Sequence, residues 1–138
     1  MTRLQRYWGE DDGATAVEFA LVLPLLLSIL FGIITFGQYF AIANSLQQFA
    51  AEAARYSVSE PFLADREGRA ISFLASPGGR FSFLNASHIS ADIDMIEGTM
   101  PAIQITLTYD LNGTAVEVAD SFLGIGITDI TRRSYLAY

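Results

Sequence analysis

The chain has no charged side chain from Phe19 to Ala51, and this uncharged run restricts its possible folds more than any other feature. The first part of the run, residues 19–37, is interrupted only by Pro24, Ser28 and Thr35. A helix needs about 20 apolar residues, at about 1.5 Å each, to cross a hydrocarbon core of about 30 Å. The run therefore predicts a transmembrane helix that is long enough to project beyond the bilayer.

The second part of the run keeps a helical period but becomes amphipathic. Its apolar residues recur at alternating spacings of four and three, which is typical of a helix face that packs against a partner. These residues are Ile42, Leu46, Phe49, Ala53 and Tyr56. Pro61 disfavours continuation of the helix past Glu60. We therefore expect one helix over residues 14–57, in the membrane at about residues 19–40 and outside it at residues 41–57.

Basic residues predict the orientation of this helix. Arg3 and Arg6 precede the apolar run, and the next basic residue is Arg55. The positive-inside rule assigns the basic flank to the cytoplasm. The N-terminus is therefore expected in the cytoplasm and the rest of the chain outside.

Length and composition exclude several classes of protein. A separate core normally takes roughly 100 to 200 residues, so a chain of 138 residues has room for one small domain beside the helix. The formal charge is −7, and a surface with this balance lacks the basic footprint of a nucleic-acid-binding protein. Cysteine is absent, which excludes disulfides and thiolate metal sites.

The rest of the chain reads as a short helix followed by strands. Apolar residues between Phe62 and Leu74 favour an amphipathic helix. Alternating residues then predict three strands, from Ile89 to Ile93, from Ile103 to Tyr109 and within Ile127 to Leu136. Asn112-Gly113 is a turn signal, and Thr114 to Val118 is a short strand candidate.

These elements together predict an α+β domain over residues 58–138. Each strand has one apolar face, which is typical of an antiparallel sheet that is covered on one side. The only long apolar stripe available to cover the sheet is the outer half of the long helix.

Residues with catalytic potential are few. His88 is the only histidine, and on a strand it would share a face with Asp92 and Asp94. That face is opposite the apolar one, so it is expected to be solvated. A single histidine and scattered carboxylates lack the ligand spacing of zinc or calcium sites. There is also no cysteine nucleophile and no glycine-rich phosphate loop. We expect no enzyme, no metal and no cofactor.

The acid at the start of the apolar run needs an explanation. An ionisable group at the edge of hydrocarbon is costly unless it finds a partner, so Glu18 indicates a functional site. An interfacial acid that reaches the headgroups is the simpler interpretation. Gly13, five residues earlier, is either a plain turn before the helix or part of the same site.

Three classes of protein could explain a chain with such an N-terminal apolar run. A secretory signal peptide is favoured by the small residues of Ala41-Ile42-Ala43, although the apolar block is too long and follows three consecutive acids. A single-pass anchor that presents a small extracytoplasmic binding domain fits the length of the span. An anchored enzyme with a concealed site is the third class.

The N-terminal motif resembles one family specifically. It combines a glycine, a glutamate five residues on, an aromatic residue next and a proline inside the apolar run. These are Gly13, Glu18, Phe19 and Pro24, and the resemblance extends to Ser57. The motif is similar to that of the TadE-like family, the pilin-like proteins of the bacterial tight-adherence (Flp type IV) pilus system. Members often carry a charged or more polar residue at the positions of Thr35 and Gln38, which leaves the packing partner of the mid-helix open.

The resemblance implies a minor pilin or pseudopilin in the bacterial inner membrane, with residues 1–13 as a cytoplasmic leader. A prepilin peptidase would cut between Gly13 and Ala14, which creates a new α-amine. Our hypothesis is that Glu18 pairs with the Ala14 ammonium of its own or of an adjacent subunit. The implied partners are that peptidase, a TadF-like pseudopilin, the Flp major pilin, the inner-membrane assembly platform and the lipid bilayer.

Overall fold

The computed structural model describes residues 8–76 and 78–138. Residues 1–7 of the predicted leader, which spans residues 1–13, therefore lie outside the described residues. Arg3 and Arg6 are among them. The chain divides into two compact units, residues 1–35 and residues 36–138.

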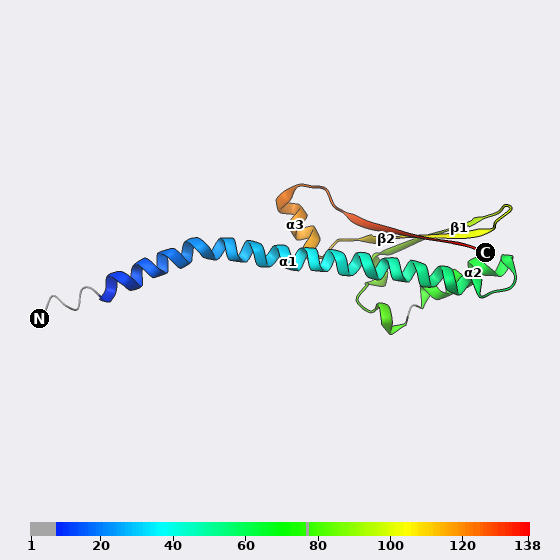
Figure 1. Ribbon diagram of the computed structural model, residues 1–138, viewed down its shortest axis with the longest axis horizontal. Helices are drawn as coiled ribbons and strands as arrows, with labels where there is room; N and C mark the ends of the chain where they lie inside the picture. The colour runs from blue at the N-terminus through cyan, green and yellow to red at the C-terminus, as the bar shows by residue number, and fades with distance from the viewer. Residues whose placement is uncertain (1–7, 77) are drawn as a thin grey trace, which may run out of the picture. The chain divides into compact units, whose positions relative to one another are not determined.

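Helix α1 runs from Trp8 to Val58 and contributes residues to both units (Figure 1). It begins before the predicted start at Ala14, so Gly13 is a helical residue and the interpretation of it as a plain turn was wrong. The helix ends in a turn in which the Glu60 N–H donates to the Ser57 carbonyl at 3.1 Å.

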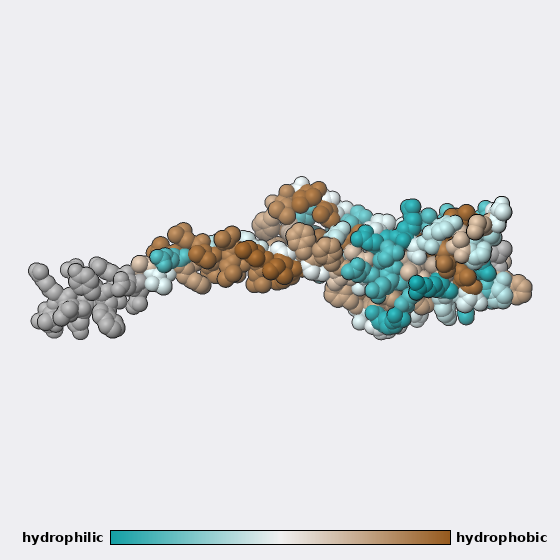
Figure 2. Space-filling view, viewed as in Figure 1, coloured by the Kyte–Doolittle hydropathy of each residue, from teal (hydrophilic) through white to brown (hydrophobic). Residues whose placement is uncertain are grey.

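The first unit presents apolar side chains on all sides of α1. Leu21, Leu25 and Ile33 are each more than 60% exposed, and the side chains around them are similarly open. The stretch has a mean hydropathy of 2.6 and none of its most apolar window is buried among the described residues. Figure 2 shows this part as an almost continuous hydrophobic surface. The described part of the chain thus contains one helix long and apolar enough to cross a membrane.

The second unit contains a three-stranded antiparallel sheet in the order β1-β2-β3. Strand β1 spans Ile89–Ile96, β2 spans Ala102–Asp110 and β3 spans Asp129–Ala137. The central strand alternates most regularly in sequence, and alternate β2 residues are buried for that reason. The prediction of three strands was correct, although β3 begins two residues later than Ile127.

The core lies between one face of the sheet and the outer half of α1. Ile103, Ile105 and Leu107 of β2 are fully buried and belong to the same hydrophobic cluster as Leu46 and Phe49 of α1. Four alanines of α1 are buried in the same cluster: Ala43, Ala50, Ala53 and Ala54. The predicted α+β class, with a long helix packed on a small antiparallel sheet, is confirmed.

Helix α2, Leu63–Ala75, closes one end of this core. Its Phe73 ring lies 5.9 Å from the Phe49 ring of α1, and the Phe81 ring lies 4.8 Å from Phe49 on another side. Phe81 belongs to a short 3₁₀ turn, Gly79–Phe81. A second 3₁₀ turn, Ala86–His88, leads into β1.

The segment after β2 is a helix, and its prediction as a strand over Thr114 to Val118 was wrong. Helix α3 spans Ala115–Leu123. Thr114 caps it, because its hydroxyl accepts the Glu117 N–H at 3.3 Å, while the Glu117 carboxylate accepts the Gly113 N–H at 2.7 Å. This Thr-x-x-Glu pattern is a capping-box signal, which identifies helix starts from sequence. Asn112-Gly113 therefore turns the chain into a helix and closes no hairpin.

We predict that Phe49→Ala destabilises the second unit by about 3–5 kcal/mol, because the large ring is 2% exposed and touches two other aromatic rings. Gln48→Ala, one residue away on the exposed side of α1, should change stability by less than about 0.5 kcal/mol. Urea unfolding of the detergent-solubilised protein, followed by near-ultraviolet circular dichroism, measures both. Equal stability of the two variants would contradict the assignment of Phe49 to the core.

Candidate functional site

The four residues of the N-terminal motif lie on α1, and so does Ala14. Gly13, Ala14, Glu18 and Phe19 are exposed, and Pro24 is exposed within the helix. Ala14 and Glu18 are four residues apart, so their side chains lie on the same face, one turn from each other. The ammonium that the ion-pair hypothesis requires at Ala14 would form only after cleavage, so the hypothesis stays a prediction.

Glu18 has no ion pair or hydrogen bond with any residue in the described part of the chain. It precedes the apolar side chains of the first unit, and Phe19 beside it is 60% exposed. If those side chains face lipid, an unpaired carboxylate here is costly, by up to about 3 kcal/mol at the bilayer centre and less at its edge. The arrangement therefore leaves Glu18 available for a partner.

Gly13 is open to approach. A Cβ built on it would meet no atom within 4 Å, and the residue is exposed. Glycine in a helix interior is about 0.5–1 kcal/mol less favourable than alanine, so α1 is intrinsically easier to unwind at this residue. A protease that needs an extended backbone would find least resistance there.

Pro24 interrupts the hydrogen-bond ladder of α1 without ending the helix. Proline has no N–H to donate, so the carbonyl four residues earlier loses its usual partner. Four residues later, the Ser28 hydroxyl donates to the Pro24 carbonyl at 2.7 Å. Such back-bonding is a common way for serine to satisfy its hydroxyl in an apolar environment.

The predicted packing seam of α1 consists of the apolar residues that recur every three or four positions, and it is buried except at its end. Ile42, Leu46, Phe49 and Ala53 are at most 2% exposed and all belong to the core. Tyr56 is 40% exposed, and its ring lies 5.1 Å from Phe73 and under the Arg69 guanidinium at 4.7 Å. Because the helix ends two residues later, Tyr56 lies at the edge of the covered surface and closes the core from outside.

Gln38 is a contact residue that the sequence pattern did not reveal. Its side-chain oxygen accepts the N–H of Ala115, the first residue of α3, at 2.7 Å. The free N–H groups of a helix start need such acceptors. Helix α3 is therefore the packing partner of the mid-helix that the resemblance left open, and Gln38 makes the contact.

His88 lies at the end of the sheet, on the 3₁₀ turn before β1 rather than on a strand. Its Nδ1 donates to the Asp110 carbonyl at 3.0 Å, because a carbonyl can only accept. The imidazole also lies 5.6 Å from the Tyr109 ring. Asp92 and Asp94 are exposed on β1. Within residues 8–76 and 78–138, no three His, Asp or Glu side chains are placed to hold a metal ion.

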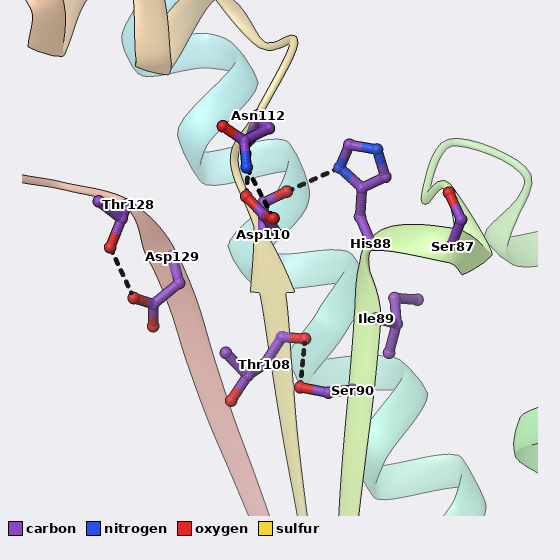
Figure 3. Close-up of a pocket in the computed structure, with 9 residues that line it drawn as sticks. All are labelled: Ser87, His88, Ile89, Ser90, Thr108, Asp110, Asn112, Thr128 and Asp129. Atoms are coloured by element: carbon purple, nitrogen blue, oxygen red, sulfur yellow. Dashed lines mark hydrogen bonds between the residues drawn. The ribbon is translucent and has the colours of Figure 1, made fainter.

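An open polar depression of about 530 Å³ surrounds His88. Figure 3 shows His88 and Ser87 on one side of it, Asp110 and Asn112 in the middle and Asp129 on the far strand. Asp110 and Asp129 are directly opposite in the β2–β3 register. Like charges in such a pair destabilise a sheet, so each carboxylate needs local donors.

Asn112 provides those donors for Asp110. Its backbone N–H donates to Asp110 Oδ1 at 2.9 Å and its side-chain amide donates to Oδ2 at 2.7 Å. Donors to the charged form favour ionisation. The pKa of Asp110 is therefore lowered, first by the backbone N–H of Asn112 and then by its side-chain amide.

We predict a titration midpoint of Asp110 below 3.8, and a rise towards that value in Asn112→Ala, which removes the amide donor. A lowered carboxyl pKa adds stability above the unfolded value of about 3.9, and this contribution disappears as the pH falls through the folded pKa. Carboxyl-detected NMR titration measures the midpoint. Ser90→Ala, in the same depression but without contact to the carboxylate, should leave it unchanged. A midpoint that does not move in Asn112→Ala would contradict the assignment.

The family model described as TadE-like protein matches residues 13–55. No curated protein and no solved structure matches the chain. The matched segment begins at Gly13 and contains every motif residue and all of the packing seam except Tyr56. The resemblance seen in the sequence is confirmed, and the match indicates a pilus-associated protein of the Tad system. From Gly13 to Arg55, this chain is similar to the TadE-like family.

Proposed function

We propose that the chain is a minor pilin or pseudopilin, a non-enzymatic structural component in the assembly of the tight-adherence (Flp) pilus. The observation that carries this proposal is the placement of Gly13 and Glu18 on one helix, within the TadE-like segment and next to an exposed apolar surface. Helix α1 anchors the chain in the bacterial inner membrane. Its N-terminus lies in the cytoplasm and residues 58–138 lie outside.

Processing is the first step of this function. A prepilin peptidase cuts between Gly13 and Ala14 and removes the leader. The exposure of Gly13 and the low helix propensity of glycine support this position, since a peptidase has to reach an unwound backbone. Cleavage leaves Ala14 as a new positively charged N-terminus.

The new charge changes the electrostatics of Glu18. An ammonium at Ala14 lies one helical turn from the carboxylate, or next to the carboxylate of an adjacent subunit. Either pairing relieves the cost of an unpaired charge beside hydrocarbon. Processing therefore makes assembly favourable, because the partner of Glu18 does not exist before the cut.

The partners follow from the same surfaces. The peptidase acts on Gly13, and the apolar sides of α1 pack against lipid, a TadF-like pseudopilin, the Flp major pilin or the inner-membrane assembly platform. Helix association in a membrane depends on packing and on interhelical polar contacts, and Glu18 supplies one such contact.

We predict that the mature protein starts at Ala14. Intact-mass spectrometry of the protein purified from its native membrane measures this start. An intact Met1 would favour an ordinary anchor that presents a small binding domain. A start at Asn44 would indicate a secreted domain released by a signal peptidase after Ala43. Gly32→Val, in the same apolar stretch, is a matched control for Gly13→Val, and only Gly13→Val should prevent the cut.

We predict that Glu18→Gln is processed normally but fails to enter pili, because the amide cannot pair with an ammonium. Glu18→Asp keeps the charge with a shorter reach and should retain part of the assembly. Quantitative immunoblots of sheared pili and of membranes measure both steps separately. If Glu18→Gln were processed and incorporated as efficiently as the wild type, the ion-pair proposal would be wrong.

A further inference from the structure

The end of α3 presents an apolar surface that no described residue covers. We call it the α3 tip, and it consists of Val118, Phe122, Leu123 and Ile125. Phe122 is 83% exposed, Leu123 68% and Ile125 63%. Figure 2 shows the same region as a compact hydrophobic projection from a unit that is otherwise mostly polar on this face. A soluble domain rarely exposes so many large apolar side chains together unless they contact something.

Backbone geometry holds this surface open. Gly124 ends α3 in the left-handed conformation at φ 63°, and Gly126 follows at φ 83°. Glycine adopts such angles without strain. The two turns lead the chain back towards β3 and leave Ile125 projecting beside Leu123, so the tip is a structured loop rather than a frayed helix end.

The acids near the tip are directed into the backbone. Asp120 Oδ1 accepts the N–H groups of Gly126 at 2.7 Å and Ile127 at 3.0 Å, and the Glu117 carboxylate accepts the Gly113 N–H. Carboxylates that are hydrogen-bonded in this way lose less when a surface approaches an apolar phase. No arginine or lysine occurs between Arg80 and Arg132, so attraction to anionic headgroups is not the basis of this surface.

The root of α3 is fixed where the apolar run of α1 ends. The Gln38–Ala115 hydrogen bond, 2.7 Å long, attaches the first residue of α3 to Gln38. Phe36 and Phe40, on either side of Gln38, are 65% and 58% exposed. Counting about 20 residues of span from Phe19 places the bilayer surface near Gln38. Figure 1 shows one end of α3 next to α1.

We propose that the α3 tip inserts into the interfacial region of the same lipid bilayer that α1 crosses, as a second membrane contact. Phe122 and Leu123 bury apolar surface in the acyl boundary, as interfacial helices do. The exposed rings of Phe36 and Phe40, on either side of Gln38, face the same lipid. This second contact fixes the orientation of the sheet relative to the bilayer. One side of the sheet is then presented to a neighbouring subunit. The inference rests on the proposed function only for the membrane span of α1.

A single tryptophan at the tip tests this proposal. In the full chain with Trp8→Phe, which removes the only native tryptophan, Phe122→Trp is reconstituted in phosphatidylcholine vesicles that contain nitroxide-labelled lipids. We expect blue-shifted emission and strong quenching by nitroxides near the headgroup, unchanged between low and high salt. Salt independence is expected because apolar insertion is not screened.

Two matched reporters make the result decisive. Phe83→Trp occupies a site on the same unit that is 55% exposed and should be several times less quenched. Leu26→Trp reports on the span and should be quenched most by nitroxides deep in the acyl chains. If Leu26→Trp is not quenched, the membrane span itself fails. If Leu26→Trp is quenched while Phe122→Trp is no more quenched than Phe83→Trp, the span holds and the α3 tip proposal is wrong. Blue-shifted emission of Phe122→Trp without lipid quenching would assign the tip to a protein partner and would overturn the lipid contact.

Discussion

One helix has to satisfy two different solvents, and the rest of the structure depends on this constraint. Up to Phe36, α1 exposes apolar side chains around its whole circumference, whereas from Ile42 onward they form one stripe and the other side is polar. The first pattern suits an apolar environment on all sides, and the second suits a packed partner on one side. The sheet covers that stripe and buries its own apolar face against it.

The composition of the stripe explains how so short a sheet can cover it. Leu46 and Phe49 fill most of the space beside β2, and the buried alanines of α1 belong to the same cluster. Ion pairs on the rim add little by comparison. The Glu52–Arg80 pair is 2.7 Å long, but the arginine side chain is 74% exposed, and such surface pairs contribute about 0–1 kcal/mol. Burial of apolar surface therefore holds the second unit together.

Sequence patterns predicted the parts of the fold that have a strong period. The seam from Ile42 to Ala53 and the alternation of β2 could both be read directly, because one face of each is buried throughout. The region from Thr114 to Val118 could not, because a run of five residues fits a strand or a helix equally well. The cap formed by Thr114 and Glu117 favours the helix over the strand. The N–H group of Ala115 is not satisfied by this cap, and it donates to Gln38, which is distant in sequence.

The candidate site was predictable to a different extent. Gly13 and Glu18 stand out by type and spacing alone, because glycine and an acid are both unfavourable where they occur. The position of His88 was not predictable, since its hydrogen bond to the Asp110 carbonyl depends on how β1 and β2 align. Tyr56 continues the period of the seam but reaches the edge of the sheet, and a period carries no information about where its partner ends.

The two acids that bound the uncharged run show why the surroundings of a charge matter more than the charge. Glu52 has a partner, Arg80, although water would stabilise it almost as well without one. Glu18 has none within the described residues, although it adjoins the apolar part of α1, where a partner would matter most. A carboxylate retained there by structural need alone would be paired within its own chain, as Asp110 and Asp120 are paired with backbone donors. Within the described residues Glu18 has no such donor, and the proposal made above supplies one, either from cleavage of the chain or from another subunit.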